Sequence, residues 1–168
     1  MESNVRFLIT FVGIPRSGKT TFRKKLISEL SGLGKEVKVI SPDEMRLEIY
    51  GERFNQQKDY LVWNKVKEYK QDLSRNGLAD VVIFDATSIT PAYRKELIND
   101  FPNFIHIAVY FDTELEVCKE RAIMTNQKDL IPVIDRMGKS ITPPTTKEGF
   151  DWVFTHCELD KLISIISD

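Results

Sequence analysis

Apolar and polar positions along the chain follow two patterns that replace each other in turn, one typical of strands and the other of helices. Runs rich in apolar residues occupy 5–12, 37–40, 81–84 and 104–111, with a weaker run at 152–154. The run at 81–84 is continuous, as expected of a strand covered on both faces. Between these runs, apolar residues recur every three or four positions, which predicts amphipathic helices. The alternation predicts an α/β fold, with a parallel sheet of about five strands and helices on both of its faces.

Capping residues mark where several of these helices begin and end. Glycines follow the helix that starts near Thr20 and are typical of a helix C-terminus. Ser41-Pro42 and Thr90-Pro91 each place an N-cap residue before a proline, the usual beginning of a helix. Further helices are predicted at residues 56–75, from the acidic segment 112–116 onward, at 133–139 and at 159–166. No repeat or linker divides the sequence, so residues 1–168 are expected to form one domain.

The segment between the first strand and the first helix has the pattern G-x-x-x-x-G-K-[ST] of a phosphate-binding loop. Its glycines allow backbone N–H groups to turn inward as an anion cradle at a helix N-terminus. Lys19 supplies a charge for the β- and γ-phosphates of ATP, and the hydroxyl of Thr20 is a ligand for Mg²⁺. The residues expected to contact the nucleotide are Gly13, Ile14, Pro15, Arg16, Ser17, Gly18, Lys19, Thr20 and Thr21.

Two acidic positions follow predicted strands, at the sheet edge where the ligands of parallel sheets gather. Asp43 and Arg46 come after the second strand. A carboxylate there can accept a proton from an attacking hydroxyl, and the arginine can hold a phosphate. The simpler interpretation is an exposed ion pair between residues three positions apart on a helix. Asp85 ends the third strand, the usual place of a carboxylate that holds Mg²⁺, or else it only marks the end of the strand.

A polar segment with several prolines comes late in the chain, and we expect it to form a lid over about residues 121–145. Arg121, at its start, suits phosphoryl transfer because closure of a lid excludes water and adds positive charge. The simpler interpretation is a solvated arginine on a helix face. Lys128, Arg136 and Lys139 lie in or beside the lid, and the sequence does not rank them.

Charge and composition limit the partners that the protein can have. Because 24 Lys and Arg stand against 25 Asp and Glu, for a formal net charge of -1, contact with a nucleic acid requires a local basic patch. The apolar run at 7–12 is too short to cross a bilayer, so no membrane contact and a cytoplasmic location are expected. Cys118 and Cys157 are interpreted as small buried or half-buried residues, and His106 as a buried histidine with a hydrogen-bond partner.

Several segments of the chain occur in an order that resembles a known family. They are the phosphate loop, Ser41-Pro-Asp43-Glu-Met-Arg46, Phe84-Asp85-Ala-Thr87, Val117-Cys-Lys-Glu-Arg121, Pro143-Pro-Thr145 and Glu148-Gly-Phe-Asp151. In this order they resemble the small P-loop kinases of the AAA-type and zeta-toxin-like group, in particular the kinase domain of bacteriophage polynucleotide kinase and its bacterial relatives. The resemblance covers about residues 5–155 and implies a P-loop NTPase fold.

The resemblance also implies roles for three residues. The aspartate that matches Asp43 is the general base on the acceptor hydroxyl, the arginine that matches Arg46 grips the acceptor-side phosphate, and the arginine that matches Arg121 belongs to the lid over ATP. Two positions depart from the family's pattern. Thr125 stands where a second lid arginine usually follows the first by four residues, and Ser88 replaces the last residue of the strand motif Asp-Ala-Thr-Asn.

The sequence therefore predicts a magnesium-dependent enzyme that moves the γ-phosphoryl group of ATP to a hydroxyl, with a polynucleotide 5′-OH end as the expected acceptor. Two alternatives stay open. The acceptor can be a small metabolite or an aminoacyl-tRNA, which the absence of a basic composition favours. The protein can instead be a nucleotide-binding switch with little transfer activity, which Thr125 favours.

Overall fold

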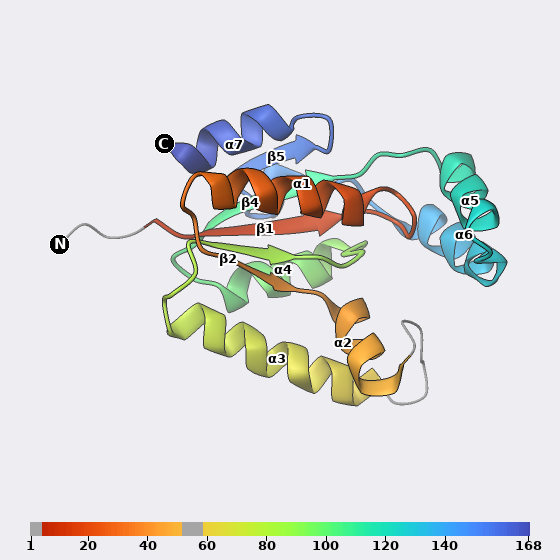
Figure 1. Cartoon of the computed structure of the whole chain (residues 1–168), viewed down its shortest axis with the longest axis horizontal. Coiled ribbons are helices and arrows are strands. Elements are labelled where there is room, and N and C mark those ends of the chain that lie inside the picture. Colours follow the sequence, from red (N-terminus) through yellow and green to blue (C-terminus); the bar gives the residue numbers. More distant parts are fainter. Residues whose placement is uncertain (1–4, 52–58) are drawn as a thin grey trace.

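The computed structural model describes residues 5–51 and 59–168, and its centre is a five-stranded sheet in which every strand pair is parallel. The strand β1 lies in the middle of the sheet, with β2 and β3 on one side of it and β4 and β5 on the other (Figure 1). The strands, in spatial order, are β2 (Val37–Ile40), β3 (Val81–Phe84), β1 (Phe7–Val12), β4 (Ile105–Tyr110) and β5 (Trp152–Thr155). The predicted α/β fold with five parallel strands is confirmed.

Strands β2 and β3 have the predicted bounds, whereas β1 and β4 are slightly shorter than the apolar runs that predicted them. Pairing begins at Phe7, which lies opposite Val81 and Ile105, so Val5 precedes β1 and is exposed. All six residues of β1 are buried, as expected of a central strand with helices on both faces. The apolar run therefore overestimates the strand by its first two residues.

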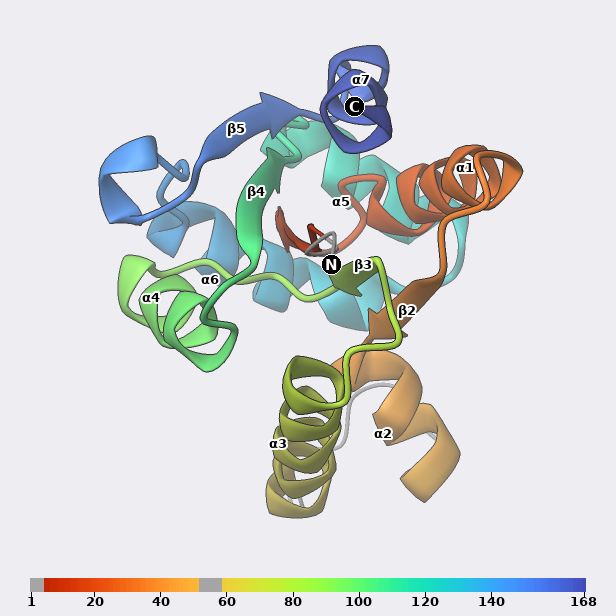
Figure 2. The same cartoon turned by 90° about the vertical axis from the view of Figure 1, so that its left-hand side faces the viewer.

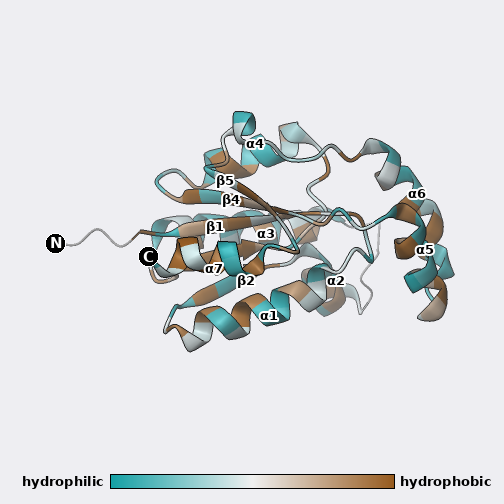
Figure 3. Ribbon diagram, turned by 90° about the horizontal axis from the view of Figure 1, so that it is seen from above, coloured by the Kyte–Doolittle hydropathy of each residue, from teal (hydrophilic) through white to brown (hydrophobic). Residues whose placement is uncertain are grey.

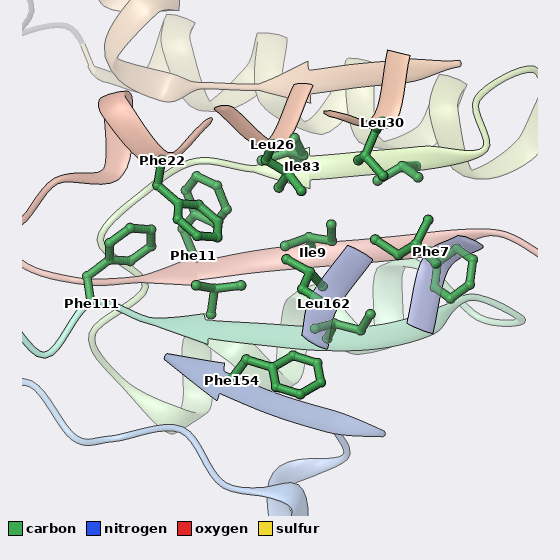
Figure 4. Close-up of a cluster of buried hydrophobic side chains, with 14 residues drawn as sticks. Phe7, Ile9, Phe11, Phe22, Leu26, Leu30, Ile83, Phe111, Phe154 and Leu162 are labelled. Atoms are coloured by element: carbon green, nitrogen blue, oxygen red, sulfur yellow. The ribbon is translucent and has the colours of Figure 1, made fainter. Parts of the chain in front are cut away.

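Two helices cover one face of the sheet, as Figure 2 shows. They are α1 (Lys19–Gly32) and α7 (Leu159–Ser167). The hydrophobic core beneath them joins both helices to the three central strands (Figure 4). Phe11, Phe22 and Phe111 meet edge to face, with ring centroids 5.1–5.6 Å apart, an arrangement that aromatic pairs prefer. This cluster packs the first turn of α1 against the end of β1.

Three helices cover the opposite face and form a second core. They are α2 (Pro42–Tyr50), α3 (Asp59–Arg75) and α4 (Pro91–Asp100). The two predicted N-caps are confirmed, because Ser41 Oγ accepts a hydrogen bond from the Glu44 N–H and Thr90 Oγ1 accepts one from the Tyr93 N–H. The helix predicted at 56–75 is present from Asp59, and residues 56–58 of that prediction lie outside the described residues.

A separate helical unit lies beyond the carboxyl ends of the strands (Figure 1, Figure 3). It consists of α5 (Leu115–Met124), a 3-10 turn at Lys128–Leu130 and α6 (Ile131–Ser140). The two helices approach closely, because a Cβ added at Gly138 would lie 2.6 Å from the Leu115 side chain. A third apolar cluster fills the space between them and includes Ile14 of the phosphate loop. The predicted lid over 121–145 thus has its own small core, and its movement stays a prediction.

Three polar or sulfur-containing residues singled out in the sequence have clear surroundings. His106 is buried and its Nε2 lies 2.9 Å from the Phe101 carbonyl oxygen, which confirms the prediction of a partnered buried histidine. Cys118 is buried, also as predicted, but Cys157 is exposed. The prediction for Cys157 is wrong because this residue lies in the turn after β5. Within the described residues, no helix is long and apolar enough to cross a membrane.

One fully buried arginine ties the end of the helical unit to the sheet. Arg94 of α4 is 0% exposed. Its guanidinium donates to Glu148 Oε1 at 2.8 Å, to the Ser88 carbonyl oxygen at 2.9 Å and to the Thr142 carbonyl oxygen at 3.0 Å. Glu148 in turn caps the 3-10 helix Thr146–Glu148 by accepting from the Thr145 N–H. Arg94 therefore fixes the segment that follows α6.

We predict that Arg94→Met destabilises the fold by about 3–5 kcal/mol, because it removes the partner of the largely buried Glu148 carboxylate and of the Ser88 and Thr142 carbonyl oxygens. Urea unfolding of the variant and the wild type measures the difference. Lys95→Met is the matched control, since Lys95 is the next residue on the helix and its side chain is exposed. This substitution should change the free energy of unfolding by less than about 0.5 kcal/mol. If Arg94→Met loses no more stability than Lys95→Met does, the structural role of Arg94 is contradicted.

Candidate active site

The predicted phosphate loop joins β1 to α1 in a conformation suited to an anion. Gly18 has φ +106° and precedes α1, whose N-terminus has no side-chain cap. The first N–H groups of a helix lack intrahelical carbonyl partners, so those at the start of α1 stay available for a ligand. Lys19 Nζ donates to the carbonyl oxygens of Gly13 and Ile14, both at 2.8 Å, and so folds back over the loop. This geometry is an anion cradle with a cation beside it.

The phosphate loop is held by the segments that follow β3 and β4. The Gly13 N–H donates to the Thr87 carbonyl oxygen after β3 at 3.0 Å, and Thr113 Oγ1, after β4, donates to the Ser17 carbonyl oxygen at 2.7 Å. A Cβ at Gly13 would lie 2.7 Å from Ser17 Oγ and 2.8 Å from the Phe111 Cβ. Only glycine therefore fits at this position without displacing its neighbours.

Asp85 lies at the end of β3, as predicted, and is paired with an arginine that the sequence analysis missed. Its carboxylate is buried, and Arg23 Nη1 donates to Asp85 Oδ2 at 2.8 Å. Arg23 also contacts Glu44 on α2. Burial raises the pKa of Asp85, whereas the charges of Arg23 and Lys19 oppose this shift. In the sequence, Arg23 is one of several basic residues on α1, and no local pattern distinguishes it.

Asp43 and Arg46 form the ion pair of the simpler interpretation, but that pair belongs to a larger network. Arg46 Nη1 donates to Asp43 Oδ1 at 2.6 Å, and its Nε and Nη2 donate to the two carboxylate oxygens of Asp59 at 2.7 and 3.0 Å. Trp63 Nε1 also donates to Asp59, at 3.2 Å, and the Arg46 guanidinium lies 5.8 Å from the centre of the Trp63 ring. The hydrogen bonds from Arg46 lower the pKa of Asp59.

The sequence analysis missed both Asp59 and Trp63, which it included only as residues of the predicted helix 56–75. The two residues are four positions apart on α3, so they share a face, but this spacing alone does not say what they contact. Their partner Arg46 lies on α2, and the packing of α2 against α3 brings them together.

Two adjoining cavities at this sheet edge share Lys19, Asp43 and Asp85 in their walls. The loop cavity, of about 750 Å³, is lined by the phosphate loop, the start of α1 and Arg121. The aromatic cavity, of about 550 Å³, is lined by Trp63 and Tyr93, together with Arg46 and residues of α6. Both volumes fall within the range of about 300–1,000 Å³ typical of small-molecule sites.

The helical unit contributes to both cavities. Arg121 is exposed, lines the loop cavity and donates from Nη1 to the Arg16 carbonyl oxygen at 3.1 Å. Thr125 lies one turn later, where its Oγ1 donates to the Arg121 carbonyl oxygen at 2.9 Å. Of the basic residues that the sequence did not rank, Arg136 lines the aromatic cavity. Lys128 and Lys139 are exposed and line neither of the two cavities.

The residues predicted to hold Mg²⁺ fit an ion that is bound mainly through a nucleotide. Thr20 and Asp85 both line the loop cavity and offer a hydroxyl and a carboxylate, the oxygen ligands that Mg²⁺ prefers. Among the described residues, no group of three or more His, Cys, Asp or Glu side chains could hold a metal by itself. Mg²⁺ does not require such a group, because in phosphate-binding sites it uses one or two carboxylates, water and substrate phosphates.

A comparison with known families decides the assignment of the chain. The AAA domain family matches residues 8–132, which contain the phosphate loop, Asp43, Asp85 and Arg121. The chain belongs to the AAA domain family. A comparison with curated proteins gives no match.

Solved structures with the same fold support the assignment of this AAA domain protein to the P-loop NTPase fold. Kti12 of Chaetomium thermophilum in complex with ADP-AlF3 has a TM-score of 0.68 at 15% identity, covering 95% of this chain and 96% of that one. The Mycobacterium tuberculosis APS kinase CysC with AMPPNP and APS has a TM-score of 0.62 at 18% identity, with 99% and 100% covered. A Sinorhizobium meliloti gluconokinase has a TM-score of 0.58 at 14% identity, with 98% and 91% covered.

The protonation of Lys19 leads to a prediction about pH. Burial lowers the pKa of Lys19 to about 8, although Asp85 and Asp43 favour its charged form. A nucleotide binds the charged form best, so above this pH the protein must take up a proton in order to bind. The affinity for a fluorescent ATP analogue should therefore fall by up to about tenfold per pH unit above the pKa of the free protein.

Fluorescence titrations between about pH 7 and pH 9.5 measure this dependence. Lys19→Gln is the control. It should bind more weakly at neutral pH, by roughly 1.5–3 kcal/mol for the loss of a charged hydrogen bond, and should lack the decline at high pH. If the affinity of both proteins declines equally with pH, a group other than Lys19 titrates.

Proposed function

We propose that this protein is a kinase that transfers the γ-phosphoryl group of ATP to a hydroxyl group. The observation that carries the proposal is the pair of cavities that share Lys19, Asp43 and Asp85. A phosphoryl transfer requires a donor and an acceptor on opposite sides of the phosphorus atom. One cavity offers the anion cradle that suits ATP, and the adjoining one leaves space for an acceptor.

On the donor side, the backbone of the loop and Lys19 hold the β- and γ-phosphates. Thr20 and Asp85 hold Mg²⁺, which neutralises charge on the phosphates when it is bound. Arg121 reaches the same cavity from α5 and adds positive charge near the transferred group. The similar structures named above support this proposal, since the APS kinase is in complex with the ATP analogue AMPPNP and Kti12 is in complex with ADP-AlF3.

On the acceptor side, Asp43 serves as the general base. Its side chain is 51% exposed and lies in the wall between the two cavities, where it can reach both an acceptor hydroxyl and solvent. A carboxylate within hydrogen-bond reach of the hydroxyl removes its proton as the oxygen attacks. Arg46 holds Asp43 in place, and its guanidinium also lines the aromatic cavity.

A polynucleotide 5′-OH end is our first candidate for the acceptor. The aromatic cavity combines Trp63 and Tyr93, on which a terminal base can stack, with Arg46 and Arg136, which can hold a phosphate. A small hydroxyl compound is the second candidate. The volume of the cavity, about 550 Å³, suits a small molecule, and two proteins of similar structure are an APS kinase and a gluconokinase. An aminoacyl-tRNA combines features of both candidates.

We predict that Asp43→Asn lowers the rate of phosphoryl transfer by about 10²–10⁴ because the amide cannot take up the proton. The affinity for ATP should stay nearly unchanged, since the phosphate loop and Lys19 hold the nucleotide. Glu48→Gln, an exposed position on the same helix, is the matched control and should keep wild-type turnover. Near-wild-type turnover by Asp43→Asn would refute the base assignment.

The acceptor is tested by incubating the protein with γ-labelled ATP and a panel of 5′-OH DNA, 5′-OH RNA, tRNA and nucleosides. The polynucleotide proposal expects label on the 5′ ends, and Arg46→Ala should raise the KM most for acceptors with a phosphate next to the reacting hydroxyl. Label on nucleosides alone would favour the small acceptor. A protein that binds ATP but labels no acceptor would instead fit a nucleotide-binding switch.

A further inference from the structure

The backbone at Arg16 adopts a conformation that arginine rarely takes. Among the described residues, four that are not glycine have positive φ, namely Arg16 (66°), Ser88 (47°), Asn103 (73°) and Asn126 (57°). Asparagine tolerates this left-handed region, and glycine adopts it freely, whereas a longer side chain makes it unfavourable. Arg16 lies in the middle of the phosphate loop, so a strained backbone position there carries a long basic side chain. Strain of this kind concentrates at functional sites.

Arg16 and Arg121 hold each other across the loop cavity. Arg16 Nη2 lies 3.5 Å from the Arg121 carbonyl oxygen, and Arg121 Nη1 donates to the Arg16 carbonyl oxygen at 3.1 Å. Both side chains line the loop cavity. The Arg16 Nε atom is buried and has no hydrogen-bond partner. The two guanidinium groups thus face the same space, and donors of Arg16 remain unused.

The charges in the walls of this cavity are unevenly compensated. Arg23 is paired with Asp85 and Glu44, so its charge is balanced within the protein. In the part of the chain that the structure describes, neither Arg16 nor Arg121 has an ion-pair partner within 4.0 Å. Two arginines with unpaired charges beside an anion cradle form a site for a multiply charged anion, because an arginine fork matches the oxygens of a phosphate.

We propose that Arg16 binds the polyphosphate of the nucleotide directly and, with Arg121, forms a two-arginine clamp on it. This inference rests on the proposed function, since it takes ATP as the anion. The loop contributes its backbone N–H groups from one side, and the clamp adds charged donors from the cavity rim. In this clamp, the contact of the Arg16 guanidinium with the ligand offsets the strain of a backbone position that glycine would adopt freely.

The test compares Arg16→Gly with the wild type by two readouts that do not require turnover. Glycine removes both the guanidinium and the strain, so the midpoint of urea unfolding should stay the same or rise. The affinity for a fluorescent ATP analogue should fall by about 10-fold to 100-fold, as expected for a lost charged hydrogen bond. Arg16→Asn is a second variant, because asparagine also tolerates the left-handed backbone.

Lys25→Ala is the matched control, since Lys25 is an exposed cation of α1 that lines the same cavity. It should lower the affinity by less than about threefold, the size of a general electrostatic effect. If Arg16→Gly loses no more affinity than Lys25→Ala does, the inference is overturned while nucleotide binding by the wild type still supports the kinase. If the wild type binds no ATP analogue, both the inference and the proposed function fail.

An Arg121→Met background separates direct binding from an effect through Arg121. If Arg16 contacts the phosphates itself, Arg16→Gly should lower the affinity of the Arg121→Met protein further, by a factor that differs from the one in the wild type because the two arginines are in contact. If Arg16 only positions Arg121, the second substitution should have no effect there, and that result would overturn the direct contact.

Discussion

Parallel pairing of β1 with both of its neighbours places the whole site. Phe7 lies opposite Val81 in β3 and Ile105 in β4, so the three strands run side by side in the same direction and their carboxyl ends reach one edge. At that edge, two hydrogen bonds join the segments that follow the three strands. One runs from the Gly13 N–H to the Thr87 carbonyl oxygen, and the other from Thr113 Oγ1 to the Ser17 carbonyl oxygen. Without this pairing, the phosphate loop would have no fixed neighbours and Asp85 would not line its cavity.

Charges at the site are arranged in two different ways. Around the wall shared by the cavities, acidic and basic groups neutralise each other within the protein, as Arg46 does with Asp43 and Asp59. Burying such a network costs desolvation free energy, which only hydrogen bonds of good geometry offset. At the rim of the loop cavity, Arg16 and Arg121 instead keep their charges unpaired. The closed network joins α2 to α3, and in the proposed clamp the open rim provides the attraction for anions.

Local patterns allowed the strands, the capped helices and the phosphate loop to be predicted, because each depends on residues close together in the sequence. Arg94 shows where such patterns fail. It lies between Tyr93 and Lys95 on a helix and looks like any solvated arginine, yet it is fully buried and donates to Glu148, which is 54 positions away. The same holds for Asp59 and Arg23, whose partners come from other elements.

The predicted site residues divide in the same way. Residues 13–21 could be identified from a contiguous motif, whereas the position of Asp43 and Asp85 in a shared wall depends on the packing of α2 against the sheet edge. Cys157 is a simpler failure, since a small apolar residue in a turn has no neighbour to cover it. Cavity shape and exposure are properties of the assembled chain, and a linear pattern does not contain them.

The close approach of α5 and α6 at Gly138 has a thermodynamic consequence. The two helices pack as one piece, and this piece lines both cavities, with Arg121 in one, Met137 in the other and Leu130 in both. Any displacement of the piece changes both cavities at once. A ligand that favours one position of the piece therefore alters the affinity of the other cavity, and linkage requires the reverse effect to be equal in free energy. Cooperativity between the two ligands then needs no contact between them, only this shared wall.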